Sequence, residues 1–224
     1  MKKEFAKEDV PFLLTYPNLD DPDGVVLLSN RYAVLQRLMV PAGEWEGVHS
    51  HPGNQLYVQI TSGEWSGRLG DEIEYWKEAE EAGSVGWVDE IPLSKQHDSG
   101  NTGNSDMELI YVTLKEPEPI NSARGCEPQV YPTITLEPLF ENHRLIAQRI
   151  ELKPGQWSGM HNRPGNQILI HISGGILEER DQGLDSKRGC TYTPGSAEWL
   201  DAAADHEIGN VGEVTMNMVL VTLK

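Results

Sequence analysis

The sequence contains little cysteine, few basic residues and no long hydrophobic stretch. Two cysteines among 224 residues, Cys126 and Cys190, do not make a disulfide framework, so we expect a reducing, cytoplasmic compartment. No apolar run approaches the roughly 18 residues that a membrane-spanning helix needs. The 18 basic side chains are outnumbered by 35 acidic ones, and the resulting net charge of −17 makes nucleic acid and membrane surfaces poor partners.

The motifs of several common enzyme classes are also missing. There is no Ser/His/Asp order, no phosphate-binding glycine loop and no Cys-x-x-Cys pair. Glycine and proline, in contrast, are abundant, with 22 and 14 residues, and they predict many turns between short strands. The composition therefore indicates a soluble, β-rich protein without indicating what it does.

The chain contains one sequence pattern twice. Residues 35–63 and 147–175 align without gaps at an offset of 112, with 12 of 29 positions identical. After a three-residue deletion, His97 also aligns with His206, and Asn101 aligns with Asn210. A repeat of this quality predicts two copies of one unit of about 85–90 residues.

The boundaries of the two units follow from composition. Residues 116–126 are rich in proline, glycine and polar residues, which interrupt both strands and helices. They form the predicted linker between an N-terminal domain, residues 1–115, and a C-terminal domain, residues 127–224. Residues 1–25 contain three prolines and are expected to form an arm that wraps around its own unit or crosses to the other.

Within each unit, the apolar residues alternate with a period of two or form short runs, as is typical of strands. Residues 72–82 alone have a helix-like composition, but their high charge and their position between strands favour an exposed, solvated excursion. This spacing of strands and turns predicts two small sandwiches or barrels in tandem. The clearest expected strands are residues 32–40, 55–61, 109–114, 168–172 and 214–220.

Histidines recur at matching positions of the two units. In the first, Gly43-x5-His49-x-His51 places two imidazoles on the same face of a strand, and His97 lies four residues before Asn101. The arrangement resembles the two motifs of the cupin superfamily, and the phrase His-Ser-His-Pro-Gly is close to the germin-like form of the first motif. The chain is therefore similar to a bicupin. This resemblance implies an all-β fold of two tandem cupin barrels, each a double-stranded β-helix or jelly roll.

The resemblance further implies one divalent transition metal in the N-terminal barrel, with His49, His51 and His97 as ligands. Three imidazoles leave two or three coordination positions open and suit Fe, Mn, Ni, Zn or Cu. Cupins with this spacing have a glutamate ligand five residues after the second histidine, where this chain has Leu56. Gln55 would ligate the metal through its amide oxygen if the turn were one residue shorter. Strand alternation, however, places its side chain on the opposite face of the strand from Leu56. Without a carboxylate the metal keeps its full charge, which favours an anionic, chelating substrate.

The second unit differs at one of the ligand positions. His161, Gln167 and His206 match the first unit, but Arg163 stands in place of the second histidine, and a guanidinium cannot bind a metal. Either this degenerate site is inactive and Arg163 makes a structural ion pair, or Arg163 binds a carboxylate. We expect a single functional metal centre, in the first unit.

Three further residues of the first unit are candidates for substrate binding. Tyr57 and Gln59 are expected at the mouth of the pocket. Arg37 recurs in the repeat, and it would hold an anionic substrate if it pointed inward, or tie the barrel rim to a carboxylate if it did not.

These patterns favour a metal-dependent bicupin that acts on a small, anionic organic molecule. Because no inward carboxylate is evident to act as a general base, a dioxygenase is favoured over an isomerase or cyclase. The alternative is a bicupin that binds a small molecule without turnover. Two barrels in one chain are compatible with a monomer that forms an intramolecular pseudo-dimer, or with a homodimer.

Overall fold

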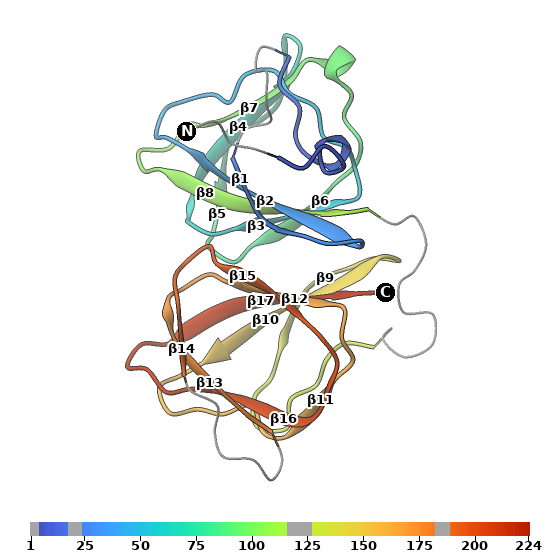
Figure 1. Ribbon diagram of the computed structural model, residues 1–224. Coiled ribbons are helices and arrows are strands. Elements are labelled where there is room, and N and C mark those ends of the chain that lie inside the picture. The colour runs from blue at the N-terminus through green and yellow to red at the C-terminus, as the bar shows by residue number, and fades with distance from the viewer. Residues whose placement is uncertain (1–4, 18–23, 116–126, 182–188) are drawn as a thin grey trace. The chain divides into compact units, whose positions relative to one another are not determined.

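The chain divides into two compact units, residues 1–117 and 118–224. The computed structural model describes residues 5–17, 24–115, 127–181 and 189–224 (Figure 1). The predicted linker, residues 116–126, lies outside the described residues. None of the helices in the described segments has the length and apolar character needed to span a membrane.

The first unit consists of strands and two short 3-10 helices, η1 (Val10–Phe12) and η2 (Leu93–Lys95). One sheet has the order β1-β2-β8-β3-β6 and the other the order β5-β4-β7, all antiparallel. The strands are β1 (Val25–Ser29), β2 (Ala33–Val40), β3 (Gln55–Gln59), β4 (Gly63–Leu69), β5 (Glu72–Glu80), β6 (Val85–Val88), β7 (His97–Asn101) and β8 (Met107–Leu114).

The second unit repeats this topology. Its sheets have the orders β9-β10-β17-β12-β15 and β11-β16-β13-β14. Strands β2 and β8 pair in the same register as their counterparts β10 and β17: Val40 lies opposite Met107, and Leu152 lies opposite Met216. The strands are β9 (Glu137–Glu141), β10 (Leu145–Leu152), β11 (His161–Arg163), β12 (Gln167–His171), β13 (Gly175–Asp181), β14 (Cys190–Tyr192), β15 (Ala197–Leu200), β16 (Ala203–Asn210) and β17 (Met216–Leu223). The prediction of an all-β chain with two tandem barrels is confirmed.

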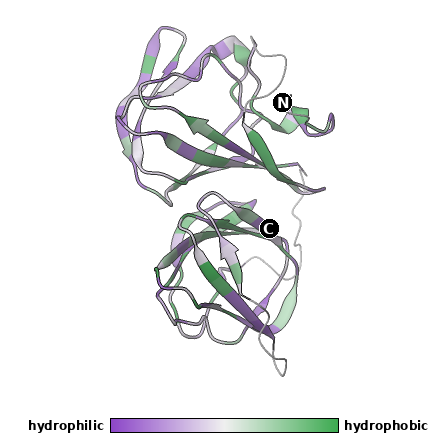
Figure 2. Cartoon of the chain, turned by 60° about the vertical axis from the view of Figure 1, so that its left-hand side comes forward, coloured by the Kyte–Doolittle hydropathy of each residue, from purple (hydrophilic) through white to green (hydrophobic). Residues whose placement is uncertain are grey.

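Alternating apolar residues build the interior of each barrel. In the first unit, Leu38 and Val40 of β2 pack with Met107, Leu109 and Tyr111 of β8. The second unit places Ile150 and Leu152 against the methionines of β17 in the same way. Hydrophobic and hydrophilic stretches accordingly lie close together along the strands, without a long apolar run (Figure 2).

The described part of the N-terminal arm wraps around its own unit. The Leu14 amide donates to Gln36 Oε1 over 3.0 Å, and Thr15 forms a bridge with Ser50. Leu14 and Tyr16 are buried in the core of that unit. The second unit makes the same connection, where the Gln129 amide donates to the oxygen of the repeated glutamine, Gln148. This bond explains why a buried glutamine recurs in both copies.

The acidic segment is not an excursion from the barrel. Residues 72–80 form β5, which pairs with β4 from Gly63↔Glu80 to Leu69↔Glu72. The segment is largely exposed, as expected, but the expectation of an excursion was wrong, because composition describes only local preference whereas the hairpin partner decides the backbone conformation. A charged strand at the edge of a sheet also resists edge-to-edge association.

The repeated tryptophans and asparagines have structural roles. The Trp45 ring covers Gly100 and the Trp157 ring covers Gly209, so closely that a Cβ atom would lie 2.7 Å and 2.3 Å from the respective rings. Asn101 is fully buried, donates to the Val40 and Ser105 carbonyls and accepts from the Gly103 amide. Asn210 makes the equivalent three bonds in the second unit.

We expect Asn101→Ala to destabilise the first unit by about 2–4 kcal/mol, because it leaves the buried Val40 carbonyl, and also the Ser105 carbonyl and the Gly103 amide, without their partner. The exposed neighbour Asn104 provides a matched control, since Asn104→Ala removes the same atoms from a solvated turn. Urea unfolding of the full chain measures both variants. Equal stability losses in the two would contradict the structural role of Asn101.

Candidate metal centre

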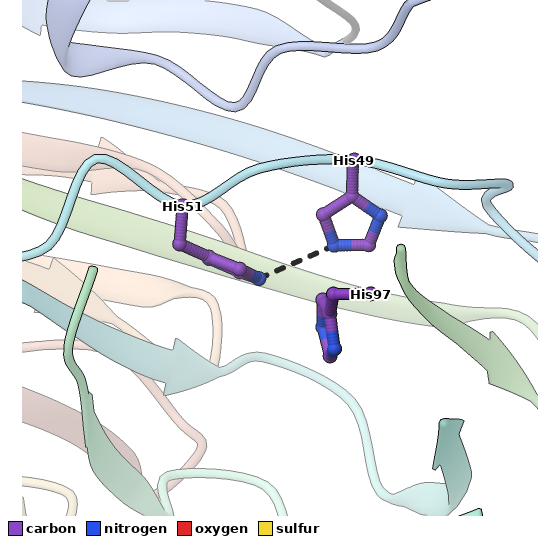
Figure 3. A group of neighbouring side chains, drawn as sticks. All are labelled: His49, His51 and His97. Carbon is purple, nitrogen blue, oxygen red and sulfur yellow. Dashed lines mark hydrogen bonds between the residues drawn. The ribbon is translucent and has the colours of Figure 1, made fainter. Parts of the chain in front are cut away.

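Three buried histidines converge inside the first barrel. His49 and His51 lie on the extended segment between β2 and β3, and His97 begins β7. A backbone bridge pairs His49 with His97, which holds the two segments side by side. The three side chains point toward one another (Figure 3), and one nitrogen from each lies within 4.8 Å of the others. The group therefore has the spacing and the donor types of a metal site.

Hydrogen bonds determine which nitrogens face the centre of this group. His49 Nδ1 donates to the Gly47 carbonyl over 2.8 Å, and His51 Nδ1 donates to Gln55 Oε1 over 2.9 Å. The two Nε2 atoms therefore carry lone pairs, and they face each other at 3.2 Å (Figure 3). Two lone pairs at this distance repel unless a cation lies between them. The residues present thus fit a divalent metal ion.

Burial keeps these imidazoles neutral. It lowers the pKa of His51 to about 3, with a further contribution from neighbouring His49. Burial is also the largest cause of the lowered pKa values of His49 and His97. Neutral imidazole is the form that binds a metal, so the cluster is ready to act as a ligand set at neutral pH.

Gln55 orients the candidate ligand His51 in this structure. Its amide oxygen accepts from His51 Nδ1, and its amide nitrogen donates to Thr113 Oγ1 over 2.8 Å. The side chain is fully buried, so both bonds lie in the barrel interior. The oxygen predicted as a possible metal ligand is therefore directed at the imidazole, where it fixes the tautomer and ring orientation of His51.

A buried carboxylate that sequence analysis missed lies beside the histidines. Glu46 Oε2 is 3.6 Å from His49 Nε2, and this side chain is only 6% exposed. It accepts a hydrogen bond from Ser99 Oγ over 2.7 Å. The premise that no inward carboxylate is present, on which the preference for a dioxygenase rested, is therefore wrong. The only signal was an acidic residue inside the first histidine motif, where the second unit has Ser158.

A cavity of about 460 Å³ opens onto the cluster, with His51 and His97 in its wall. Tyr57 and Gln59 line it, in the region predicted from the sequence. Arg37 is not among the lining residues, because its guanidinium pairs with Glu108. The remaining lining is aromatic, aliphatic and acidic: Trp65, Glu74, Tyr75, Glu78, Ala79, Glu80, Val88, Ile91, Ser99, Leu109 and Tyr111.

The charge of this lining does not support the predicted anionic substrate. Three glutamates and no lysine or arginine occur among the residues that line the cavity. Glu74 Oε2 lies 3.4 Å from His97 Nδ1, so the acidic side chains come close to the histidines themselves. The prediction considered only the charge of a metal ion and did not anticipate these carboxylates, because they come from the segment expected to be solvated.

The second barrel has two of the three histidines. The His161 and His206 rings lie 4.3 Å apart, and burial is the largest cause that lowers the pKa of His161 to about 4. Arg163 donates to the Asp201 carbonyl and lies 3.4 Å from Glu179. Gln167 donates to Thr222 Oγ1, as Gln55 does to Thr113. Within the described part of the chain, only the first unit has a group of three or more side chains that could hold a metal.

No family model matches the sequence, and no curated protein matches it. The structure, however, is similar to solved structures over most of its length. AerE from Microcystis aeruginosa matches 86% of this chain and 88% of its own, with 12% identity and a TM-score of 0.56. Oxalate decarboxylase from Lactobacillus farciminis matches 86% of this chain and 77% of its own, with 13% identity and a TM-score of 0.54.

A mutant of salicylate 1,2-dioxygenase from Pseudoaminobacter salicylatoxidans matches 93% of this chain and 75% of its own, with 9% identity and a TM-score of 0.54. At these identities the likeness shows the fold alone. Chains described as cupin domain and cupin barrel proteins are also among the matches. Two antiparallel barrels with corresponding strand orders, and the likeness to these structures along nearly the whole chain, show that the chain has the cupin fold twice in tandem, which is a bicupin-like fold.

Proposed function

We propose that the first unit is a metal-dependent enzyme that acts on a small organic molecule held in the cavity. The observation that supports this proposal is the convergence of three buried, neutral imidazoles, two of which, His51 and His97, line that cavity. His49, His51 and His97 would hold one divalent transition metal. The metal would supply Lewis acidity and, if it were Fe, Ni or Cu, the capacity to react with dioxygen.

The side chains around the cluster perform the other tasks of such a site. Gln55 orients His51, and the Gly47 carbonyl orients His49. Glu46 places a buried carboxylate 3.6 Å from His49 Nε2, where it would accept a proton from a molecule bound at the metal. Trp65 and Tyr111 are more than nine-tenths buried and form aromatic walls of the cavity.

Two reaction classes fit this arrangement. The set of three neutral imidazoles favours oxygenation, because it leaves several coordination positions for substrate and dioxygen. Glu46 favours proton transfer, as in an isomerase or cyclase, since it supplies the general base that the sequence did not reveal. Among the similar folds, one belongs to a dioxygenase and one to a decarboxylase, so barrels of this kind are found in enzymes of more than one reaction class.

We expect untagged protein to contain about one metal ion per chain, measured by inductively coupled plasma mass spectrometry. His97→Ala should lose most of it, because two imidazoles bind far more weakly than three. His206→Ala, the matching change in the second unit, should retain it. Two metals per chain would contradict the single centre, and no metal after reconstitution would leave only a small-molecule-binding barrel.

The metal that is found directs the assay of activity. With Fe, Ni or Cu, oxygen consumption is measured across a panel of small hydroxylated aromatic and aliphatic compounds. With Zn or Mn, exchange of substrate carbon-bound hydrogen with deuterated water is measured instead, because proton abstraction by Glu46 would incorporate deuterium. Glu46→Gln should abolish that exchange while leaving metal content unchanged.

Gln55→Ala should weaken zinc binding about 10–100-fold, because it removes the bond that orients His51. Gln55→Glu should restore most of the affinity, since a carboxylate also accepts from His51 Nδ1. The matched control is Gln167→Ala, which breaks the corresponding bond to Thr222 in the unit where Arg163 replaces the second histidine. Competition with a chromophoric chelator gives the affinities. Equal weakening by the two alanine variants would show that Gln55 acts only through the fold.

A further inference from the structure

Acidic and aromatic side chains surround the cavity beside the three histidines. We infer that its ligand carries an ammonium group, or a comparable organic cation, which lies among Glu74, Glu78 and Glu80 while the rest of the molecule extends toward the histidines. This inference rests on the proposed function, whose substrate class it specifies.

The first argument is the balance of charge. Three glutamates line the cavity and no lysine or arginine does. A divalent metal on three neutral imidazoles would add two positive charges, and three negative charges minus two still leave one negative charge. Glu46, buried beside His49, makes the balance more negative. An anion would therefore enter a site that remains negative even with its metal, whereas a cation would be attracted to it.

The second argument is an unused hydrogen-bond acceptor. Gln59 is fully buried and lines the cavity, and its amide nitrogen donates to the Thr61 carbonyl over 2.9 Å. Its Oε1 atom has no hydrogen-bond partner among the described residues. A buried acceptor without a donor is costly, so the ligand is expected to supply one. Ammonium has three N–H donors and no acceptor, which complements both this oxygen and the carboxylates.

The third argument is the aromatic lining. Trp65, Tyr57, Tyr75 and Tyr111 contribute ring surface to the same cavity. Burial, followed by nearby carboxylates, raises the pKa of Tyr75 to about 12, so its phenol stays neutral. Aromatic faces attract organic cations, most strongly where water is excluded. Glutamates and aromatic rings around one cavity are the combination that recognises amines.

The glutamates keep accepting capacity for such a ligand. The Glu80 carboxylate receives bonds from Tyr57 and Ser84, which fix it in place at the cavity. Glu78 lines the cavity from an exposed position of β5. Glu74 is about one-third exposed and lies beside His97. The three carboxylates thus lie along β5, and the one beside His97 is itself partly open to solvent, where a cation can reach it.

The test uses metal-free full-length protein and three phenols of matched shape: tyramine, a cation; 4-ethylphenol, which is neutral; and 4-hydroxyphenylacetate, an anion. None has the adjacent oxygens of a chelator, so the result depends neither on the metal nor on turnover. Titration followed by ligand-observed NMR, at about 0.15 M salt to screen distant charges, gives the dissociation constants. We expect tyramine to bind at least tenfold more tightly than 4-hydroxyphenylacetate.

Two double variants separate the cavity from the overall charge of the chain. Glu74→Gln/Glu78→Gln should reduce the tenfold preference to less than threefold. Glu72→Gln/Glu81→Gln removes two charges from exposed neighbouring positions that do not line this cavity and should leave the preference intact. Equal or tighter binding of the anion, no binding of any probe, or the same loss in both variants would overturn the inference. A chain that prefers tyramine but never retains a metal would instead overturn the proposed function alone.

Discussion

The candidate metal centre depends on two hydrogen bonds that orient imidazole rings. The Gly47 carbonyl and the Gln55 amide oxygen each accept from an Nδ1 atom, so both Nε2 lone pairs point to one place in the barrel. Without these bonds the rings could rotate or change tautomer, and the two nitrogens could become donor and acceptor to each other. Burial then keeps the rings neutral, since it penalises protonation. Geometry and protonation state thus have the same structural origin.

The two units show which parts of this arrangement belong to the barrel and which to the site. The glutamine–threonine bond, the tryptophan over a glycine and the buried asparagine occur in both units. They maintain the fold. The second histidine and the buried glutamate occur only in the first unit. In the second unit, Arg163 and Ser158 occupy the corresponding positions. Arg163 brings a positive charge near His161, which opposes binding of a metal cation there.

The repeat predicted the fold because two aligned copies reveal the period, the turns and the core positions together. All five strands expected from apolar patterns were found, with shifts only at their ends. The spacing of the histidines likewise predicted the cluster of three that the structure contains. Glu46 escaped prediction because it lies between strands, where alternation gives no direction for a side chain. The role of residues 72–80 was missed because composition cannot show that a charged segment pairs with β4 and borders the cavity.

This last error changes the expected chemistry. A metal with neutral ligands suggests attraction of anions, but that argument counts only the ligands. Here β5 adds three carboxylates to the cavity wall, and the segment before the first histidine adds a fourth beside it. Four negative charges exceed the two of a divalent ion. Selectivity at this site would then be divided: the histidines hold the metal that activates the ligand, while the acidic hairpin determines which ligands approach. The two functions reside on separate segments of the chain, which meet where Glu74 of β5 lies beside His97.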